Sequence, residues 1–190
     1  MPVGWRELIG IPWIAFVAYW AIAAMRTRRA EKEEPATSRY GVVSLLAIGY
    51  ALLFFEGTRV GVLGERIMSP SSWPEIAGLA LTCLGIGLAL WARSHLGANW
   101  SARITIKEGH ELIRTGPYAR LRHPIYSGLD LATIGTAMVI DQWGCILGVA
   151  FVVVAYWIKA RKEESMLTAR FGDAFRDHCR HTGFLFPKFG

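Results

Sequence analysis

Five long apolar stretches, separated by polar segments, dominate the chain and predict helices that cross a membrane. A spanning helix needs roughly 20 mostly apolar residues, with a range of about 17–25. The last two stretches are short for a full span, so we expect them to lean on each other or to continue into their polar flanks. The five stretches are residues 8–25, 42–55, 76–91, 125–140 and 145–158.

The last two stretches allow either one bent helix or two helices. The polar sequence Asp-Gln-Trp-Gly at positions 141–144 interrupts them, and together they exceed 30 residues. That length favours two helices joined by a tight turn. Within the third stretch, Gly85 and Gly87 follow no strand, so they do not form a dinucleotide-binding fingerprint and instead predict a close contact between helices.

The basic residues give an independent prediction of topology, because cytoplasmic loops carry an excess of Lys and Arg. All but three of the 21 Lys and Arg residues lie in segments 26–40, 92–123 and 159–190. With five spans, these segments all fall on one side. The predicted fold is therefore an all-α polytopic membrane protein with about five transmembrane helices, its N-terminus outside and its C-terminus cytosolic. A basic cluster follows the first stretch, which indicates a retained helix and not a cleaved signal peptide.

Composition and charge agree with this picture. Apolar residues make up 53% of the 190 residues and charged residues 19%, against about 45–50% and 25% in soluble domains. The net charge of +6 is explained by topology and anionic lipid, so no nucleic-acid partner is predicted. The cysteines, Cys83, Cys145 and Cys179, are far apart. They predict free thiols, and no metal site is predicted.

Polar residues gather in the second half of the chain, on the predicted cytosolic side. We therefore expect a three-span membrane region at 1–94 and a catalytic region with a cofactor pocket at 95–190. The protein is expected in the cell membrane, or in the endoplasmic reticulum if its source is eukaryotic, with its active site on the cytosolic face.

A first polar cluster, residues 116–128, combines two Tyr, two Arg and one His with Gly and Pro. Gly-Pro predicts a turn, and Pro124 suits the first turn of a helix, where its missing N–H costs nothing. His123 is then expected at the helix N-terminus, where N–H groups and the helix dipole favour an anionic ligand group, reinforced by Arg122. The alternative is an interfacial anchor of snorkelling Arg and headgroup-level Tyr.

A second cluster, residues 159–167, continues the last apolar stretch into the cytosol. Glu163 and Glu164 diverge by about 100° around a helix axis. We expect one of them to face the interior and the other to face solvent. An inward carboxylate would indicate function, whereas an exposed, salt-bridged helix face is the alternative.

Together these clusters resemble the isoprenylcysteine carboxyl methyltransferase family and, more loosely, phospholipid methyltransferases. The resemblance covers about residues 95–190. It depends on His-Glu-Leu-Ile at 110–113, on Gly-Pro-Tyr-x3-Arg-His-Pro-x-Tyr-x-Gly, and on Glu-Glu-x-x-Leu-x4-Gly followed by Pro187.

The resemblance implies S-adenosylmethionine as methyl donor and a lipophilic or prenylated acceptor that enters from the bilayer. At the family's Arg near the acceptor this chain has Lys159, with Arg161 close by as a substitute. An acceptor with an ionised carboxylate needs no general base. An amine acceptor needs one, and Glu163, Glu164 and His110 are the candidates. A thiol is the third possible acceptor. The implied donor contacts are Arg103, His110, Glu111, Leu112, Ile113, Tyr118, Arg122, His123, Pro124, Ile125, Tyr126 and Glu163.

Two other functions compete with methyl transfer. Membrane reductases of sterol or isoprenoid double bonds, which use NADPH, share a similar Arg-His-x-x-Tyr and acidic C-terminal pattern. They usually have Asn where this chain has Pro124, which favours the transferase. A non-catalytic membrane scaffold is the third hypothesis, and it predicts that no ligand binds.

Overall fold

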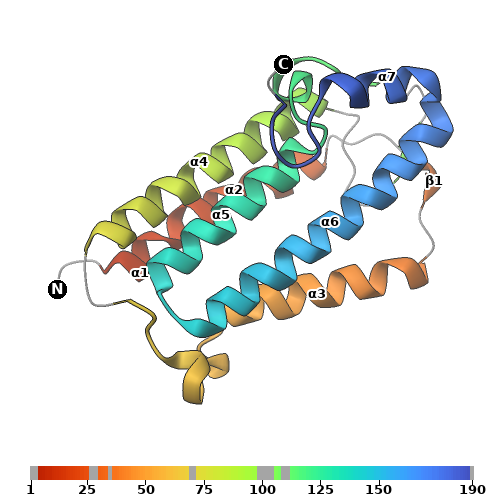
Figure 1. The fold of residues 1–190 in the computed structure, drawn as a ribbon. Coiled ribbons are helices and arrows are strands. Elements are labelled where there is room, and N and C mark those ends of the chain that lie inside the picture. Colours follow the sequence, from red (N-terminus) through yellow and green to blue (C-terminus); the bar gives the residue numbers. More distant parts are fainter. Residues whose placement is uncertain are drawn as a thin grey trace.

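The computed structural model describes residues 4–25, 30–33, 36–68, 72–97, 105–107 and 112–188. These residues form an elongated helical bundle (Figure 1), as the sequence predicts, with one addition. A short antiparallel ribbon pairs β1 (Ala30–Glu33) with β2 (Thr105–Lys107). The helices are α1 (Trp5–Leu8), α2 (Gly10–Ala24), α3 (Ala36–Phe54), α4 (Ser72–Leu96), α5 (Pro124–Ile140), α6 (Trp143–Phe171) and α7 (Asp173–His181). Short 3-10 turns lie at Glu56–Thr58, Gly61–Gly64 and Gly116–Ala119.

Each predicted apolar stretch forms a helix. Among the described residues, α4 and α6 are long and apolar enough to cross a membrane, and Gly10–Ala24, Tyr40–Phe54 and Pro124–Ile140 are shorter apolar helices. Large apolar side chains lie exposed on the outside of the bundle, such as Ile14 (70% exposed) and Leu84 (66%). Soluble monomers rarely show such extensive apolar surface, so this surface suits lipid.

The predicted break between α5 and α6 is confirmed. Asp141 ends α5 in the left-handed region, with φ 55°, and α6 begins two residues later. The buried Asp141 carboxylate accepts a hydrogen bond from Arg66 Nε at 2.9 Å and another from the backbone N–H of Met68 at 3.1 Å. These contacts fix the turn between the two helices.

Small residues bring α4 and α5 close together along most of their length (Figure 1). A Cβ atom on Gly85 would lie 2.4 Å from the carbonyl oxygen of Gly128, and one on Gly78 would lie 2.6 Å from that of Gly135. The prediction of a close contact at Gly85 is therefore confirmed. At Gly87 it is wrong, because a Cβ there would meet nothing within 4 Å.

The second helix pair, α3 with α6, meets in the same way, and Trp13 of α2 connects the two pairs. Gly49 and Gly148 face each other where α3 crosses α6. Trp13 Nε1 donates to Thr136 Oγ1 of α5 at 2.9 Å, while its ring packs edge-on against Tyr50 of α3. These contacts join the two pairs into one bundle, in which Tyr126 near the start of α5 meets Glu163 of α6.

Candidate functional site

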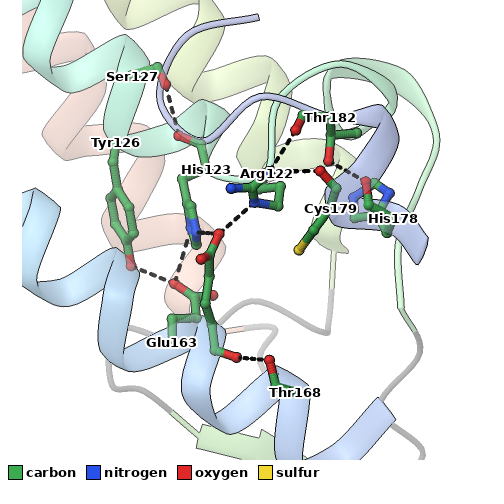
Figure 2. A network of polar contacts seen from close by, with 10 residues as sticks. Arg122, His123, Tyr126, Ser127, Glu163, Thr168, His178, Cys179 and Thr182 are labelled. Atoms are coloured by element: carbon green, nitrogen blue, oxygen red, sulfur yellow. Dashed lines mark hydrogen bonds and ion pairs between the residues drawn. The ribbon is translucent and has the colours of Figure 1, made fainter. Parts of the chain in front are cut away.

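The candidate site lies where α5 begins, beside the polar extension of α6 (Figure 2). As predicted, His123 is the N-cap of α5 and Pro124 occupies its first turn. No side chain of the described residues caps this helix terminus. Its N–H groups and the positive end of the helix dipole therefore suit an anionic ligand group.

The predicted Gly-Pro turn is the 3-10 turn Gly116–Ala119, and it fixes Tyr118 inside the protein. Gly116 has φ 59°, and a Cβ there would lie 2.8 Å from the His95 ring, so glycine suits this position. The Tyr118 hydroxyl lies 3.5 Å from the carbonyl oxygen of Ala92. Burial, together with the nearby charge of Glu163, raises the pKa of Tyr118 well above its usual value, so this phenol stays protonated at neutral pH.

The buried His123 side chain lies between two carboxylates. Its Nε2 is 3.2 Å from Glu164 Oε1, and its Nδ1 is 3.7 Å from Glu163 Oε2. Both glutamates therefore reach the ring, and the predicted contrast between an inward and an exposed carboxylate is one of degree. The two nitrogens of one imidazole point in different directions, so neighbouring helix positions can both reach the ring. The Glu163 side chain is nevertheless the more accessible, at 37% exposed against 13% for Glu164.

Arg122 forms an ion pair with Glu164 and joins the C-terminal segment to the site. Its Nε donates to Glu164 Oε1 at 2.5 Å, and its Nη1 donates to the carbonyl oxygen of Thr182 at 2.5 Å (Figure 2). Glu164 lies in the polar extension of α6, beyond the apolar residues. Burial raises the pKa of Glu164, but hydrogen bonds from His123 and Arg122 and their charges outweigh this and lower it. The carboxylate therefore stays ionised at neutral pH.

Tyr126 connects the carboxylates to an aromatic stack. Its hydroxyl donates to Glu163 Oε2 at 3.0 Å, and its ring stacks on Tyr156 with centroids 5.2 Å apart. The Lys159 ammonium lies 5.5 Å from the Tyr126 ring centroid. Arg161 instead lies against the rings of Trp157 and Phe184, so of the two basic side chains Lys159 is the one that reaches Tyr126.

The residues after α7 complete the site, and the sequence analysis missed their role. The Gly183 carbonyl accepts from the N–H of Arg122 at 2.9 Å, and Ser127 Oγ donates to the carbonyl oxygen of Leu185 at 2.7 Å. Phe184 packs edge-on against His123, with centroids 5.2 Å apart. A Cβ on Gly183 would lie 1.7 Å from the Phe186 carbonyl oxygen. Gly183, just before the aromatic residues of the tail, was the available sequence signal.

The remaining predicted residues divide into two groups. Arg103, His110 and Glu111 lie outside the described residues. Leu112 and Ile113 are half-buried, and Ile113 packs against the main apolar core. Within the described ranges, no group of three His, Cys, Asp or Glu side chains could hold a metal ion.

Comparison with known proteins relates this chain to one enzyme family. The profile of the isoprenylcysteine carboxyl methyltransferase (ICMT) family matches residues 78–169. The chain is 27% identical to Uncharacterized protein YpbQ of Bacillus subtilis, over 84% of this chain and 94% of that protein. It is 30% identical to Protein-S-isoprenylcysteine O-methyltransferase B of Arabidopsis thaliana, over 73% of this chain and 67% of that enzyme.

The fold also matches a solved structure. The eukaryotic intramembrane Ras methyltransferase ICMT superposes with a TM-score of 0.54 over 83% of this chain, at 23% sequence identity. The chain spans about half the length of that protein, 54%, and less than half of several relatives named protein-S-isoprenylcysteine O-methyltransferase. At this identity the superposition shows a shared fold.

Proposed function

Because the chain belongs to the isoprenylcysteine carboxyl methyltransferase family, we propose that it transfers a methyl group from S-adenosylmethionine to a lipophilic acceptor. The observation that carries this proposal is the arrangement of His123, Tyr126 and Glu163 at the uncapped start of α5. It offers groups for each part of a ligand that has a cation, an amine and a carboxylate.

The donor set fits S-adenosylmethionine. When bound, this cofactor supplies an electrophilic methyl group on a sulfonium cation. The Glu163 carboxylate is accessible and suits the amino group, and the Tyr126 ring, which already lies 5.5 Å from the Lys159 ammonium, is an aromatic group compatible with a nearby cation. The N–H groups at the start of α5 suit the carboxylate of the amino-acid part of S-adenosylmethionine. We also assign His110 to Ile113, Arg103 and Tyr118 to this binding region, on the family resemblance.

The more buried groups hold these ligand-binding groups in place. Arg122 directs its guanidinium to protein oxygen atoms, Glu164 among them, so we assign it a positioning role. Glu164 in turn orients His123. Phe184 packs edge-on against the imidazole, whose side chain is only 3% exposed, so water has little access to it. Alignment and exclusion of water account for much of the acceleration expected for a displacement at carbon.

The acceptor enters from the bilayer in this proposal. Lys159, on the Tyr126 ring, is the basic residue placed to contact its polar group. The site then lies at the cytosolic end of five spans, with residues 1–94 as a membrane region and 95–190 as the catalytic region. The chain is similar to enzymes named protein-S-isoprenylcysteine O-methyltransferase, which makes a prenylated carboxylate one candidate acceptor.

Calorimetry on the purified protein in detergent tests the proposal. We expect S-adenosylmethionine to bind and Glu163→Gln to weaken that binding by about tenfold, the loss of one charge-assisted hydrogen bond. Labelled methyl groups should appear in a membrane lipid extract. Binding of NADPH with no binding of S-adenosylmethionine would favour the reductase, and binding of neither would favour the scaffold.

A further inference from the structure

A single charged residue, Asp130, interrupts the apolar surface of α5. Ionisable side chains within membrane-spanning helices are costly, and they usually face a protein interior and serve a function. Asp130 lies one helical turn after Tyr126, so both side chains lie on one face of α5. That face leads from the candidate site into the membrane-facing part of the bundle.

The position of the Asp130 carboxylate suits a ligand. Its Oδ1 atom is buried, and no hydrogen-bond donor among the described residues reaches it. The residue as a whole is only half-buried. One turn further on, Ile134 is 39% exposed on the outside of the bundle. A lipophilic molecule that arrives laterally from the bilayer can therefore approach this carboxylate.

Polar aromatic side chains connect Asp130 with the candidate site. Tyr156, which stacks on Tyr126, shares a hydrogen bond with Tyr50 at 3.1 Å between the two hydroxyls. Asp130 lies one helical turn from Tyr126, on the same face of α5 as the ring that stacks on Tyr156. Together Tyr50, Asp130 and Tyr156 form what we call the inner polar group. Its two phenols continue the aromatic stack of Tyr126, and its carboxylate follows Tyr126 by one turn of α5.

The other carboxylates near His123 are already engaged. Glu164 accepts from Arg122 and stays ionised in that ion pair. Glu163 accepts from the Tyr126 hydroxyl and, in the proposed function, holds the donor's amino group. Among the acidic side chains of α5 and α6, Asp130 is the one whose buried oxygen has no donor within the described part of the chain.

We propose that Asp130 accepts the hydrogen bond and then the proton of the methyl acceptor, so that the acceptor is a lipophile with an O–H, N–H or S–H nucleophile. This inference rests on the proposed function and narrows its substrate class. The nucleophile forms its bond to the methyl carbon while the bond between that carbon and the donor sulfur breaks. Its proton passes to the Asp130 carboxylate, and the donor leaves as a neutral thioether.

A carboxylate acceptor fits this position poorly. It has no proton to give at neutral pH, and its charge would repel Asp130 where water is scarce. A protic group is instead stabilised by the carboxylate, because hydrogen bonds to an ionised acceptor are the stronger ones. The inner polar group therefore discriminates between protic and carboxylate acceptors.

The test compares the wild type with Asp130→Asn in detergent, using labelled S-adenosylmethionine. The probes are 4-dodecylphenol, dodecylamine and dodecanethiol, with N-acetyl-S-farnesylcysteine as the carboxylate probe. Mild alkali distinguishes the products, since methyl esters release their label while ethers, amines and thioethers keep it. The matched control is Asp141→Asn, the same substitution at the far end of α5, where the carboxylate binds Arg66.

We expect the wild type to form an alkali-stable product from at least one protic probe. Asp130→Asn should lower this rate by about 100-fold, the low end for loss of a general base. It should weaken equilibrium binding of the same probe, measured without donor, by about fivefold. Donor affinity should stay within twofold for both variants, and the control should keep the wild-type rate per folded molecule.

Alkali-labile product alone, no product from the protic probes, or a wild-type rate in Asp130→Asn would each overturn the inference. If S-adenosylmethionine still binds in these cases, the proposed function is not contradicted. A wild type that binds no donor would instead overturn the proposed function, and this inference with it.

Discussion

Replacing Glu164 with Gln removes the carboxylate that binds both Arg122 and His123, and it tests whether this ion pair holds the site together. The Arg122 and Glu164 side chains are only 14% and 13% exposed, with 2.5 Å between the paired atoms. Removal of one partner of a buried ion pair costs about 3–5 kcal/mol, because the other charge stays buried. Gln keeps one acceptor oxygen, so we expect the low end, about 3 kcal/mol.

The measurement is thermal unfolding of the purified protein in detergent. A loss of 1 kcal/mol lowers Tm by roughly 2–4 °C for a chain of this size, so Glu164→Gln should lower Tm by about 6–12 °C. Donor affinity should fall less than in Glu163→Gln, because Glu164 acts by orienting His123.

Glu163→Gln is the matched control, since it makes the same chemical change one residue earlier. The Glu163 side chain is 37% exposed, and Gln keeps an acceptor oxygen for the Tyr126 hydroxyl while losing the charge. We expect a cost of about 1 kcal/mol or less and a marked loss of donor affinity. Equal Tm changes in the two variants, or the larger donor effect in Glu164→Gln, would refute the assignment of separate roles.

Three further predictions follow from the same structure. Asp141→Asn keeps a residue that tolerates φ 55° but loses the ion pair to Arg66, so it should lower the free energy of unfolding by about 1–3 kcal/mol in a thermal unfolding assay; an unchanged Tm would contradict this. Gly85→Leu should cost about 3 kcal/mol or prevent folding, as seen by size-exclusion chromatography, because its Cβ would lie 2.4 Å from a backbone oxygen of α5. Gly87→Leu, with nothing within 4 Å, should elute like the wild type. Folding lowers the pKa of Glu164, so the stabilising effect of this carboxylate is present above the ordinary pKa of glutamate, about 4.3, and is lost as the pH falls through the pKa of the folded state. Below about pH 4.3 the Tm difference between wild type and Glu164→Gln should therefore shrink. A Tm difference that stays constant with pH would contradict this assignment.

Much of the candidate site could be predicted from local sequence. Pro124 has a fixed φ and no N–H, so it identified the start of α5, and His123 followed as the N-cap. The relation between Glu163 and Glu164 could not be predicted in the same way. Helix geometry gives the angle between the two side chains, but only the position of the His123 ring shows that both carboxylates reach it.

The glycines show a similar limit. Gly85 and Gly87 look alike in sequence, because both lie within one apolar stretch. Only the crossing of α4 with α5 shows that Gly85 meets a backbone oxygen and that Gly87 meets nothing. The C-terminal residues 182–185 were missed because their contacts with Arg122, His123 and Ser127 join positions about 60 residues apart.

By itself, the sequence determined which apolar stretches form helices, the helix start at Pro124 and the family resemblance. These depend on periodicity, composition and backbone chemistry, which are local properties of the chain. The tertiary structure decided which polar groups meet. It paired Arg122 with Glu164, placed Lys159 on Tyr126 and left Oδ1 of Asp130 without a donor among the described residues. Such pairings depend on how helices distant in sequence cross, and this crossing is fixed by close packing of the glycines of α3 to α6.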